Sequence, residues 1–446
     1  MFVEEKLKQL MLPEPVAIIG AGLTGKSCFN LLSAVGIQCQ VFDERKILPQ
    51  HFSENPDMVA LGPFEAKTFA EFATILVSPG VDLRRACFVN AVAKIITDIE
   101  LFGRLTTRPV IGVTGSNGKS SVVSMLHLAT QQQGLDYLLC GNIGVPVLAA
   151  LQGSDDQCDG YIVELSSYHL ERAPSLHLAI GTWLNVSPDH LDRYDSYADY
   201  VATKAKIFAQ ADYCVANAAD SNVLDYAQKY NNVVYFSGER NRMIPATYHC
   251  EADMIYAGQQ ALFDMANFSQ VGLHHAENIM AVFAMAKRLK IRDAAVVAAC
   301  QQFVPLPSRS VTVGKKDGVL FINDSKGTNV GAAVAAIRGI DAPIILIAGG
   351  QGKGQDFSPL KQVCKNHAKH VLLMGEDAPL LATVLQGSVA ISRVNDLNEA
   401  VSTAIRIAVP GDVVLLSPAC ASFDMFSSYL ARGDLFEKIV REWIDA

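Results

Sequence analysis

The sequence predicts an α/β protein of three domains in which the sheets are mostly parallel. Short apolar runs alternate with longer amphipathic stretches through most of the chain, which is typical of strands that alternate with helices. The length of 446 residues also corresponds to three domains, at a usual domain size of about 150 residues. Two proline-containing connectors divide the apolar runs into three series.

The elements follow one another in the order expected for parallel α/β units. The first series contains an apolar strand at Val16–Ile19, a helical stretch at Lys26–Ala34 and a strand at Gln38–Phe42. The second series begins at Val110–Thr114 and includes Tyr161–Val163 and Ile180–Leu184. The third begins at Val319–Ile322 and includes Ile344–Ala348, Val371–Met374 and Val413–Leu416. With connectors at 102–109 and 303–308, we expect domains at residues 1–97, 98–304 and 305–446.

Composition and charge restrict the class of protein. Half of the residues are hydrophobic, so the chain can build substantial cores. The net charge of −8 argues against a nucleic-acid or anionic-membrane surface. The first residues resemble neither a secretory signal nor an anchor, and no stretch reaches the roughly 20 apolar residues of a membrane span. The ten cysteines form no C-x-x-C pair, so we expect reduced thiols in a cytoplasmic protein without membrane insertion.

The strongest functional signal is the loop Thr-Gly-Ser-Asn-Gly-Lys-Ser-Ser at 114–121, between a predicted strand and a predicted helix at Val122–Gln131. The N–H groups of such a loop surround a phosphate, and the helix N-terminus adds partial positive charge. Lys119 would reach the terminal phosphates, and the Ser120 hydroxyl would hold Mg²⁺. The pattern G-x-x-x-x-G-K-[ST] is not fully met, because Val113 stands five residues before Gly118. We predict a nucleoside triphosphate site here; the alternative is a turn with a solvated lysine.

Two neighbouring strands end in polar residues. Glu164 follows Tyr161–Val163, and Ile180–Leu184 leads to a segment that contains His190. Because parallel strands end at one edge of the sheet, we expect Glu164 and His190 to converge with Ser120 on a metal. Mg²⁺ prefers oxygen, so histidine would be an unusual ligand that an open, hydrated site allows. Taken singly, Glu164 is better explained as a surface or capping residue, and His190 as an ordinary hydrogen-bonded histidine.

The first series contains a second glycine-rich loop. Residues 20–25, Gly-Ala-Gly-Leu-Thr-Gly, fit G-x-G-x-x-G after an apolar strand, and Asp43 lies 18 residues beyond Gly25. This arrangement predicts a nucleotide diphosphate at the helix N-terminus and an acidic contact to a ribose hydroxyl. Gly80 lies in a further loop on the same sheet edge. The alternative is a tight turn without a ligand.

Three loops rich in glycine and serine follow strands of the third series: 323–329 (NDSKGTN), 349–354 (GGQGKG) and 417–424 (SPACASFD). Glycines with lysines suit carboxylates and phosphates, although loops in α/β proteins are commonly rich in these residues. Because the three loops are expected at the same edge of the sheet, they favour a binding face there. No local base pattern supports Cys420 as a nucleophile.

Together these motifs resemble the Mur ligase family, and the resemblance covers the whole chain. Besides the loops above it includes 141–144 (GNIG), 164–171 (ELSSYHLE) and 189–194 (DHLDRY). The phosphate loop and DHLDRY are similar across the family, whereas ELSSYHLE, NDSKGTN and SPACASFD resemble its D-glutamate-adding branch. The resemblance implies a Rossmann-like N-terminal domain, a central P-loop-type ATPase domain with a mostly parallel sheet, and a Rossmann-like C-terminal domain.

The resemblance also implies an activity: ATP-dependent ligation of D-glutamate to UDP-N-acetylmuramoyl-L-alanine through an acyl phosphate, in the cytoplasmic synthesis of peptidoglycan precursors. It implies ATP and two Mg²⁺ ions as cofactors, and we expect a monomer. The UDP-sugar is expected at Gly22, Leu23, Thr24, Asp43, Gly80 and Asn142. ATP is expected at Gly115, Ser116, Asn117, Gly118, Lys119, Ser120, Ser121, Asn278, Arg309 and Asp324. The metal ligands implied are Ser120, Glu164, His190 and Lys204. D-Glutamate is expected at Thr328, Lys353, Ser422, Phe423 and Tyr429, and the implied catalytic residues are Lys119, His190 and Lys204.

The resemblance further implies that Lys204 is carbamylated, although the pattern alone would make it an exposed helical lysine. A neutral, desolvated amine can capture CO₂, and the carbamate supplies the oxygen ligands that Mg²⁺ prefers. Two positions depart from the family: His274-His275 replaces His-Asn, and Ser308-Arg309-Ser310 replaces His-Arg-Phe. The role of His275 and the adenine contacts around Arg309 therefore stay open.

Other protein classes share part of the pattern. An oxidoreductase with a nicotinamide cofactor would use the 20–25 loop but would leave Lys119 without a role. A nucleotide-binding regulatory protein without turnover would have lost part of the set Lys119, Glu164, His190 and Lys204. A folate polyglutamate synthetase shares the phosphate loop but gives less reason for an N-terminal diphosphate-binding domain.

Overall fold

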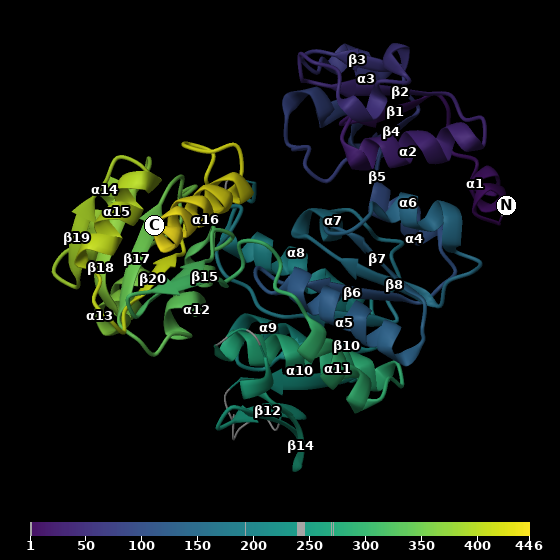
Figure 1. The fold of residues 1–446 in the computed structure, drawn as a ribbon. Coiled ribbons are helices and arrows are strands. Elements are labelled where there is room, and N and C mark those ends of the chain that lie inside the picture. Colours follow the sequence, from purple (N-terminus) through teal and green to yellow (C-terminus); the bar gives the residue numbers. More distant parts are fainter. Residues whose placement is uncertain (1, 192, 239–245, 269, 271) are drawn as a thin grey trace.

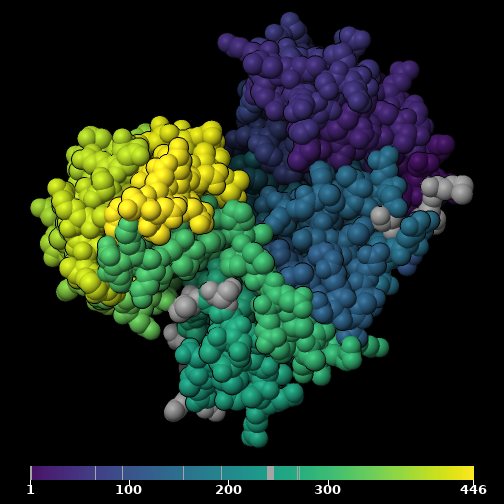
Figure 2. Space-filling model, viewed as in Figure 1, coloured from purple at the N-terminus to yellow at the C-terminus, as the bar shows by residue number. Residues whose placement is uncertain are grey.

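The computed structural model describes residues 2–191, 193–238, 246–268, 270 and 272–446, and each third of the chain contains its own sheet. The purple first unit and the green-to-yellow third unit lie at different sides of the central unit (Figure 1). In the space-filling view they form separate lobes on it (Figure 2). The predicted fold class, three α/β domains with mostly parallel sheets, is confirmed. The boundaries at 97/98 and 304/305 stay predictions.

The first sheet has five parallel strands in the order β3-β2-β1-β4-β5. This order reverses direction between β1 and β4, and ligands of open α/β sheets bind at such a point. The strands are β1 (Val16–Ile19), β2 (Cys39–Asp43), β3 (Val59–Leu61), β4 (Thr74–Val77) and β5 (Ile95–Thr97). The helices are α1 (Phe2–Leu10), α2 (Leu23–Ala34) and α3 (Ala66–Ala70), with 3₁₀ turns η1 (Gln50–Phe52), η2 (Pro56–Met58) and η3 (Ala86–Lys94).

The central sheet has nine strands in the order β14-β13-β12-β11-β10-β9-β6-β8-β7, and only β13 runs antiparallel to its neighbours. Its strands are β6 (Val110–Thr114), β7 (Tyr137–Gly141), β8 (Gly160–Glu164), β9 (Ile180–Trp183), β10 (Cys214–Asn217), β11 (Val233–Ser237), β12 (Tyr248–Glu251), β13 (Met254–Ala257) and β14 (Gln260–Asp264). The helices are α4 (Asp98–Leu105), α5 (Lys119–Gln133), α6 (Val147–Ser154), α7 (Ser167–Glu171), α8 (Tyr197–Ala209), α9 (Ser221–Ala227), α10 (Leu273–Arg288) and α11 (Asp293–Gln302), with a 3₁₀ turn η4 (Met265–Asn267).

The third sheet has six strands in the order β15-β16-β20-β17-β18-β19, and only β15 is antiparallel. Its strands are β15 (Val311–Lys316), β16 (Val319–Asn323), β17 (Ile344–Gly349), β18 (Ala368–Met374), β19 (Ala390–Arg393) and β20 (Val413–Leu416). The helices are α12 (Val330–Arg338), α13 (Ser358–His367), α14 (Ala378–Leu385), α15 (Leu397–Ile407) and α16 (Tyr429–Asp445).

The strands at the middle of each sheet are buried on both faces. Every residue of β1, β6, β17 and β20 is buried, as expected for parallel sheets covered by helices on both sides. Val110 packs into a core that the first and central domains share, and Ile111 packs into a second core of the central domain. The sheet edge with the polar loops is therefore held on a rigid layer.

Two helices begin earlier than predicted. Helix α2 starts at Leu23 instead of Lys26, and α5 starts at Lys119 instead of Val122. Apolar periodicity marks only the buried face of a helix, so it misses a polar first turn. The sequence patterns did not predict the N-terminal helix α1 or the hairpin β13–β14.

All ten cysteines are free thiols, and most of them are buried. No helix within the described ranges combines the length and the apolar character needed to cross a bilayer.

Candidate active site

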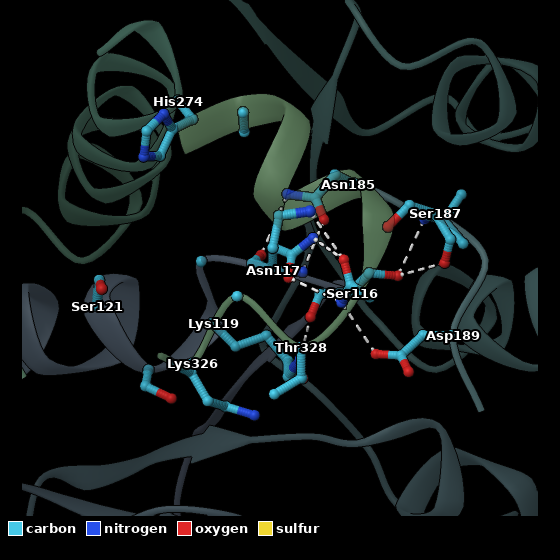
Figure 3. A pocket seen from close by; sticks show the side chains of 18 of the residues that line it. Ser116, Asn117, Lys119, Ser121, Asn185, Ser187, Asp189, His274, Lys326 and Thr328 are labelled. Atoms are coloured by element: carbon cyan, nitrogen blue, oxygen red, sulfur yellow. Dashed lines mark hydrogen bonds between the residues drawn. The ribbon is translucent and has the colours of Figure 1, made fainter. Parts of the chain in front are cut away.

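A cavity of about 490 Å³ lies where the strands of the central sheet end and the third domain approaches them (Figure 3). It brings together most of the residues predicted for the nucleotide and the metal. Among the predicted site residues, those that line it are Ser116, Asn117, Gly118, Lys119, Ser120, Ser121, Asn142, Glu164, His190, Lys204, Asn278, Arg309, Asp324 and Thr328.

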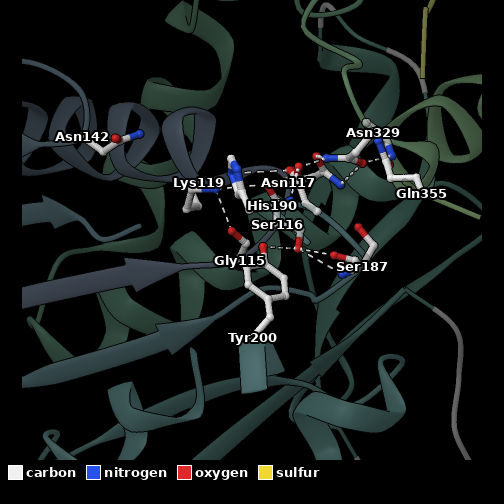
Figure 4. Close-up of polar contacts among 12 residues, drawn as sticks. Gly115, Ser116, Asn117, Lys119, Asn142, Ser187, His190, Tyr200, Asn329 and Gln355 are labelled. Atoms are coloured by element: carbon white, nitrogen blue, oxygen red, sulfur yellow. Dashed lines mark hydrogen bonds and ion pairs between the residues drawn. The ribbon is translucent and has the colours of Figure 1, made fainter. Parts of the chain in front are cut away.

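The loop between β6 and α5 folds as a phosphate-binding turn. Gly118 is the N-cap of α5 with a φ of 84°, a conformation that favours glycine. A side chain at Gly118 would also collide with the amide of Asn278 on α10. The Lys119 Nζ donates to the carbonyl oxygens of Gly115 at 2.6 Å and Ser116 at 3.0 Å (Figure 4). The amine is thus held over the loop, beside the free N–H groups of the helix terminus.

A second lysine from a distant helix reaches the same loop. Lys204 on α8 is only 1% exposed, and its Nζ donates to Gly115 O at 3.0 Å. Burial, reinforced by the neighbouring Lys119 charge, holds the pKa of Lys204 well below its usual range. Burial also lowers the pKa of Lys119. Because both amines share the Gly115 carbonyl, this site favours a neutral Lys204.

Glu164 supplies a buried carboxylate at the end of β8. Its Oε1 accepts from Asn142 Nδ2 at 2.8 Å, whereas its buried Oε2 has no hydrogen-bond partner. An unpaired buried carboxylate oxygen is costly, so Glu164 Oε2 is suited to hold a cation. The described part of the chain contains no group of three His, Cys, Asp or Glu side chains that could hold a metal ion. A metal here would therefore also need hydroxyl, water or carbamate oxygens, which suits Mg²⁺.

His190 follows β9 and has a φ of 56°, a rare conformation for a residue other than glycine. Its ring centroid lies 5.1 Å from that of Tyr168, and its Nε2 lies 3.8 Å from Asp189 Oδ2. Burial lowers the pKa of His190, although the Asp189 carboxylate opposes this shift. Strained backbone of this kind is frequent at functional sites.

Arg309 extends from the third domain to the phosphate loop. Its Nη2 donates to Ser120 Oγ at 2.9 Å. Both neighbours have positive φ, 60° for Ser308 and 51° for Ser310. Ser308 Oγ accepts from Asn323 Nδ2 at 3.3 Å, and the N–H of Ser310 donates to Asp324 Oδ1 at 3.1 Å. The two serines that depart from the family pattern therefore dock the Arg309 segment onto the 323–329 loop.

Asp324 is a buried carboxylate at the end of β16. Its Oδ2 accepts from Ser417 Oγ at 2.7 Å, which joins the first and third loops of the third domain. Burial raises the pKa of Asp324 to about 6. Burial also lowers the pKa of Lys326, nearby in the same loop, to about 8. The cavity wall therefore contains ionisable groups whose pKa values would change when an anion binds.

The remaining residues predicted for D-glutamate lie outside the cavity wall, in the third domain. Lys353 Nζ is 5.8 Å from the ring centroid of Phe423, which is 65% exposed, whereas Ser422 is buried. The ring of Tyr429 lies 4.8 Å from Lys326 Nζ. The Lys353 charge also contributes to the lowered pKa of His190 in the central domain.

The residues predicted for the UDP-sugar form a separate group in the first domain, apart from Asn142, which lines the cavity. Gly22 is the N-cap of α2, Leu23 and Thr24 lie in its first turn, and Gly80 follows β4. Asp43 accepts from the Ala21 N–H at 2.6 Å and from the Arg45 guanidinium. The Arg45 hydrogen bonds lower the pKa of Asp43 to about 2. Asp43 thus anchors the glycine-rich loop in this structure.

Several cavity residues were not among the predicted sites. Asn185 and Asp189 follow β9, the same strand end that leads to His190, so that position could have identified them. Asn329 ends the 323–329 loop that was expected on a binding face, although nothing in its position indicated an interdomain contact, whereas Tyr200, a helical tyrosine, carries no comparable signal. His274 and His275 also line the cavity, with ring centroids 3.9 Å apart and with the His275 Nε2 buried without a partner.

Three family models match the chain. They are "Mur ligase MurD-like, N-terminal domain" at residues 14–100, "Mur ligase middle domain" at 113–286 and "Mur ligase, glutamate ligase domain" at 308–420.

Two curated relatives are similar over almost their whole length. The UDP-N-acetylmuramoylalanine--D-glutamate ligase of Nitrosococcus oceani is 40% identical over 440 residues, which cover 95% of this chain and 96% of that protein. The protein of the same name from Coxiella burnetii is 38% identical over 442 residues, or 95% and 98% of the two chains.

Solved structures share the fold at lower identity. UDP-N-acetylmuramate-alanine ligase MurC from Thermotoga maritima has a TM-score of 0.61 at 15% identity, covering 96% of this chain and 99% of its own. MurF ligase from the same organism, in complex with ADP, has a TM-score of 0.61 at 15% identity, covering 97% and 96%.

Proposed function

The chain belongs to the Mur ligase family of ATP-dependent ligases, and from this premise we propose that it joins D-glutamate to UDP-N-acetylmuramoyl-L-alanine. The family acts in the synthesis of peptidoglycan precursors. Support for the specific reaction comes from the two relatives named for it, which match 95% of the chain. The proposed division of labour is UDP-sugar in the first domain, ATP in the central domain and D-glutamate in the third.

One observation carries the ATP-dependent chemistry. Two lysine amines, from Lys119 and Lys204, converge on the carbonyl of Gly115 at the start of the phosphate loop. The unpaired Oε2 of Glu164 lies in the wall of the same cavity. Positive charge and an unsatisfied carboxylate at a helix N-terminus suit a magnesium-bound triphosphate.

Ser120, Glu164, His190 and carbamylated Lys204 are the residues that would hold Mg²⁺ in this proposal. When bound, Mg²⁺ supplies charge that offsets the repulsion between the triphosphate and the substrate carboxylate. Burial favours the neutral form of Lys204, which is the form that reacts with CO₂, and Lys119 contributes positive charge beside the loop.

In the first step, a carboxylate oxygen of the terminal L-alanine attacks the γ-phosphorus of ATP. The bond between that phosphorus and the β–γ bridging oxygen breaks, which gives an acyl phosphate and ADP. The amine of D-glutamate then attacks the acyl carbon, an amide forms and inorganic phosphate leaves. Lys119 and Arg309 stabilise the transferred charge, and no protein nucleophile takes part. The third domain covers the cavity and excludes water that would hydrolyse the acyl phosphate.

We further propose that the chain works as a monomer in the cytoplasm.

Phosphate release from ATP, with UDP-N-acetylmuramoyl-L-alanine and a panel of amino acids, tests the assignment. We expect release to require both the UDP-sugar and D-glutamate, with L-glutamate and L-lysine as matched controls. Equal activity with L-lysine, or none with any amino acid, would contradict the proposal. Fluorescence transfer to added NADH should be absent, and its presence would favour the oxidoreductase alternative.

A further inference from the structure

Asn329, the N-cap of α12, uses its side-chain amide in four hydrogen bonds. Its Oδ1 accepts from the Ala332 N–H at 2.8 Å and from Asn117 Nδ2 at 3.3 Å. Its Nδ2 donates to Asn117 Oδ1 at 3.2 Å and to Asp189 Oδ2 at 3.1 Å. An amide offers two donors and two acceptor sites, so the capacity of this side chain is fully used. Asn329 is 3% exposed.

Three of these bonds join the third domain to the central domain. Asn117 lies in the phosphate loop, 212 residues away in sequence, and Asp189 directly precedes His190. Asn117 is itself fixed by Asn185, whose Oδ1 accepts from the Asn117 N–H at 2.9 Å and whose Nδ2 donates to its carbonyl at 3.1 Å. Figure 4 shows Asn329 and Asn117 directed toward each other. The reciprocal amide pair therefore connects two segments that are both held in place.

The first turn of α12 also approaches the central domain closely. A Cβ added at Gly331 would lie 2.5 Å from the Ser187 Oγ, which is buried without a hydrogen-bond partner. A side chain at position 331 would separate the two domains here. The contact around Asn329 is thus a packed interdomain junction and not an isolated pair.

We propose that Asn329 is a positioning residue for phosphoryl transfer, and this inference rests on the proposed function. Its amide holds the third domain in register with the phosphate loop through Asn117 and with the His190 segment through Asp189. Thr328, the residue before it, is predicted to contact D-glutamate, so the same junction sets the distance between amino acid and phosphate. Serine or aspartate would also cap α12, but neither can donate to both Asn117 and Asp189.

The variant Asn329→Asp separates the capping of α12 from the hydrogen bonds that Asn329 donates to the central domain. Aspartate keeps the helix cap and the acceptor for Asn117 Nδ2, but it replaces both donated bonds with a carboxylate oxygen that faces Asp189. We expect kcat for phosphate release to fall at least about tenfold, since small displacements of reacting groups are costly. The KM for the UDP-sugar should change by less than about twofold, since the first domain is untouched.

A charge swap provides the rescue. In Asn329→Asp combined with Asp189→Asn, the new amide at 189 donates to the new carboxylate at 329, and the net charge of the pair is unchanged. The swap restores the bond to position 189 but not the one donated to Asn117 Oδ1, so we expect a partial recovery of kcat, at least about threefold above that of Asn329→Asp, since contacting residues couple. A kcat that is unchanged in Asn329→Asp, or that does not recover in the swap, would overturn the proposal.

A pair of alanine variants controls for the loss of a helix cap. Asp396 caps α15 in the same domain, where its Oδ1 accepts from the Glu399 N–H at 2.9 Å. Both Asn329→Ala and Asp396→Ala remove a helix cap and should lower the midpoint of thermal unfolding, the first by more because it also loses three interdomain bonds, but only Asn329→Ala should lower kcat. Equal loss of kcat in both would show a purely structural role and would overturn the proposal.

Small-angle X-ray scattering distinguishes this inference from the proposed function. With ADP and Mg²⁺ present, Asn329→Asp should increase the radius of gyration of the full chain, and the charge swap should restore it. An inactive unsubstituted chain would contradict the ligase assignment alone, whereas an unchanged radius of gyration would overturn the role of Asn329.

Discussion

Two of the glycine-rich loops that join a strand to a helix, at residues 20–27 and 114–120, resemble a lysine-type phosphate loop. The one that matches the pattern in full does not fold as such a loop. Residues 20–27, Gly-Ala-Gly-Leu-Thr-Gly-Lys-Ser, meet G-x-x-x-x-G-K-[ST], whereas the loop at 114–120 does not. Yet Lys119 is held over its own loop, while Lys26 Nζ donates to Asn55 Oδ1 at 2.8 Å. Lys26 Nζ also lies 4.9 Å from the ring centroid of Phe52.

The difference lies in where each helix begins. Helix α2 starts at Leu23, so Lys26 is already a helical residue and its side chain points along the helix surface. Helix α5 starts at Lys119 itself, after the left-handed Gly118. Gly25 is required for another reason, because a Cβ there would collide with the carbonyl of Gly20. A pattern that counts residues does not report the helix start, and the helix start decides what the lysine can reach.

The largest expected effect is that of Lys119→Ala. Removing the amine from the helix N-terminus should lower kcat for phosphate release by at least about a thousandfold, the scale found for charged groups that stabilise phosphoryl transfer. An unchanged midpoint of thermal unfolding would show that the loop still folds. Retention of more than a tenth of the activity would contradict the assignment of Lys119, and not Lys26, to the triphosphate.

Lys204→Ala should lower kcat by at least about a hundredfold, since loss of even the outer partners of metal ligands costs about 10–100-fold. Added acetate or propionate should restore part of the activity, because a free carboxylate can replace the carbamate oxygens. Lys206→Ala is the matched control, since this exposed lysine of the same helix only donates to Glu171 O at 3.0 Å. Full activity of Lys204→Ala without added acid would exclude the carbamate.

The first domain, through Asp43, and the cavity, through Asp324 of the third domain, should also differ in their pH dependence. Asp324 has a folded-state pKa of about 6, above its unfolded value of 3.8, because it is buried. The folded state then binds more protons between pH 3.8 and 6, so this group's contribution to stability is present below the unfolded pKa and is lost as pH rises through 6. Asp43 has a pKa of about 2, held down by Arg45, so its contribution is present above pH 3.8 and is lost as pH falls through 2.

Thermal unfolding of Asp324→Asn and Asp43→Asn from about pH 4 to pH 7 measures this difference. As pH rises, the thermal unfolding midpoint of the unsubstituted chain should fall relative to that of Asp324→Asn. The difference in midpoint between the unsubstituted chain and Asp43→Asn should stay constant. Parallel curves for both pairs would contradict the opposite pKa shifts.

The smallest expected effect is that of Lys26→Ala. Its amine contacts Asn55 and two aromatic rings, so kcat should change by less than about twofold, and the loss should appear as a small decrease in stability. A large increase in the KM for the UDP-sugar would show that Lys26 binds a phosphate after all.

Much of the fold followed from periodicity. The predicted strands Val110–Thr114 and Val413–Leu416 have the observed limits, because a strand buried on both faces is apolar at every position. The antiparallel β15 and the hairpin β13–β14 could not be predicted, since they lie at or next to sheet edges and each strand has only one buried residue, which leaves no clear apolar pattern. Glu164 and His190 could be proposed from strand ends alone, whereas Asn329 could not, since its partners come from another domain.

The sequence by itself determined the number of domains, the phosphate loop and the polar residues at the strand ends, because these depend on local spacing and on the common edge of parallel strands. Only the tertiary structure decided that Lys204 is buried against Gly115, that Arg309 reaches Ser120 and that Asn329 pairs with Asn117. These contacts join residues that are far apart in the chain. The protonation of these side chains and the geometry of their contacts depend on burial, which exists only after the domains have packed together.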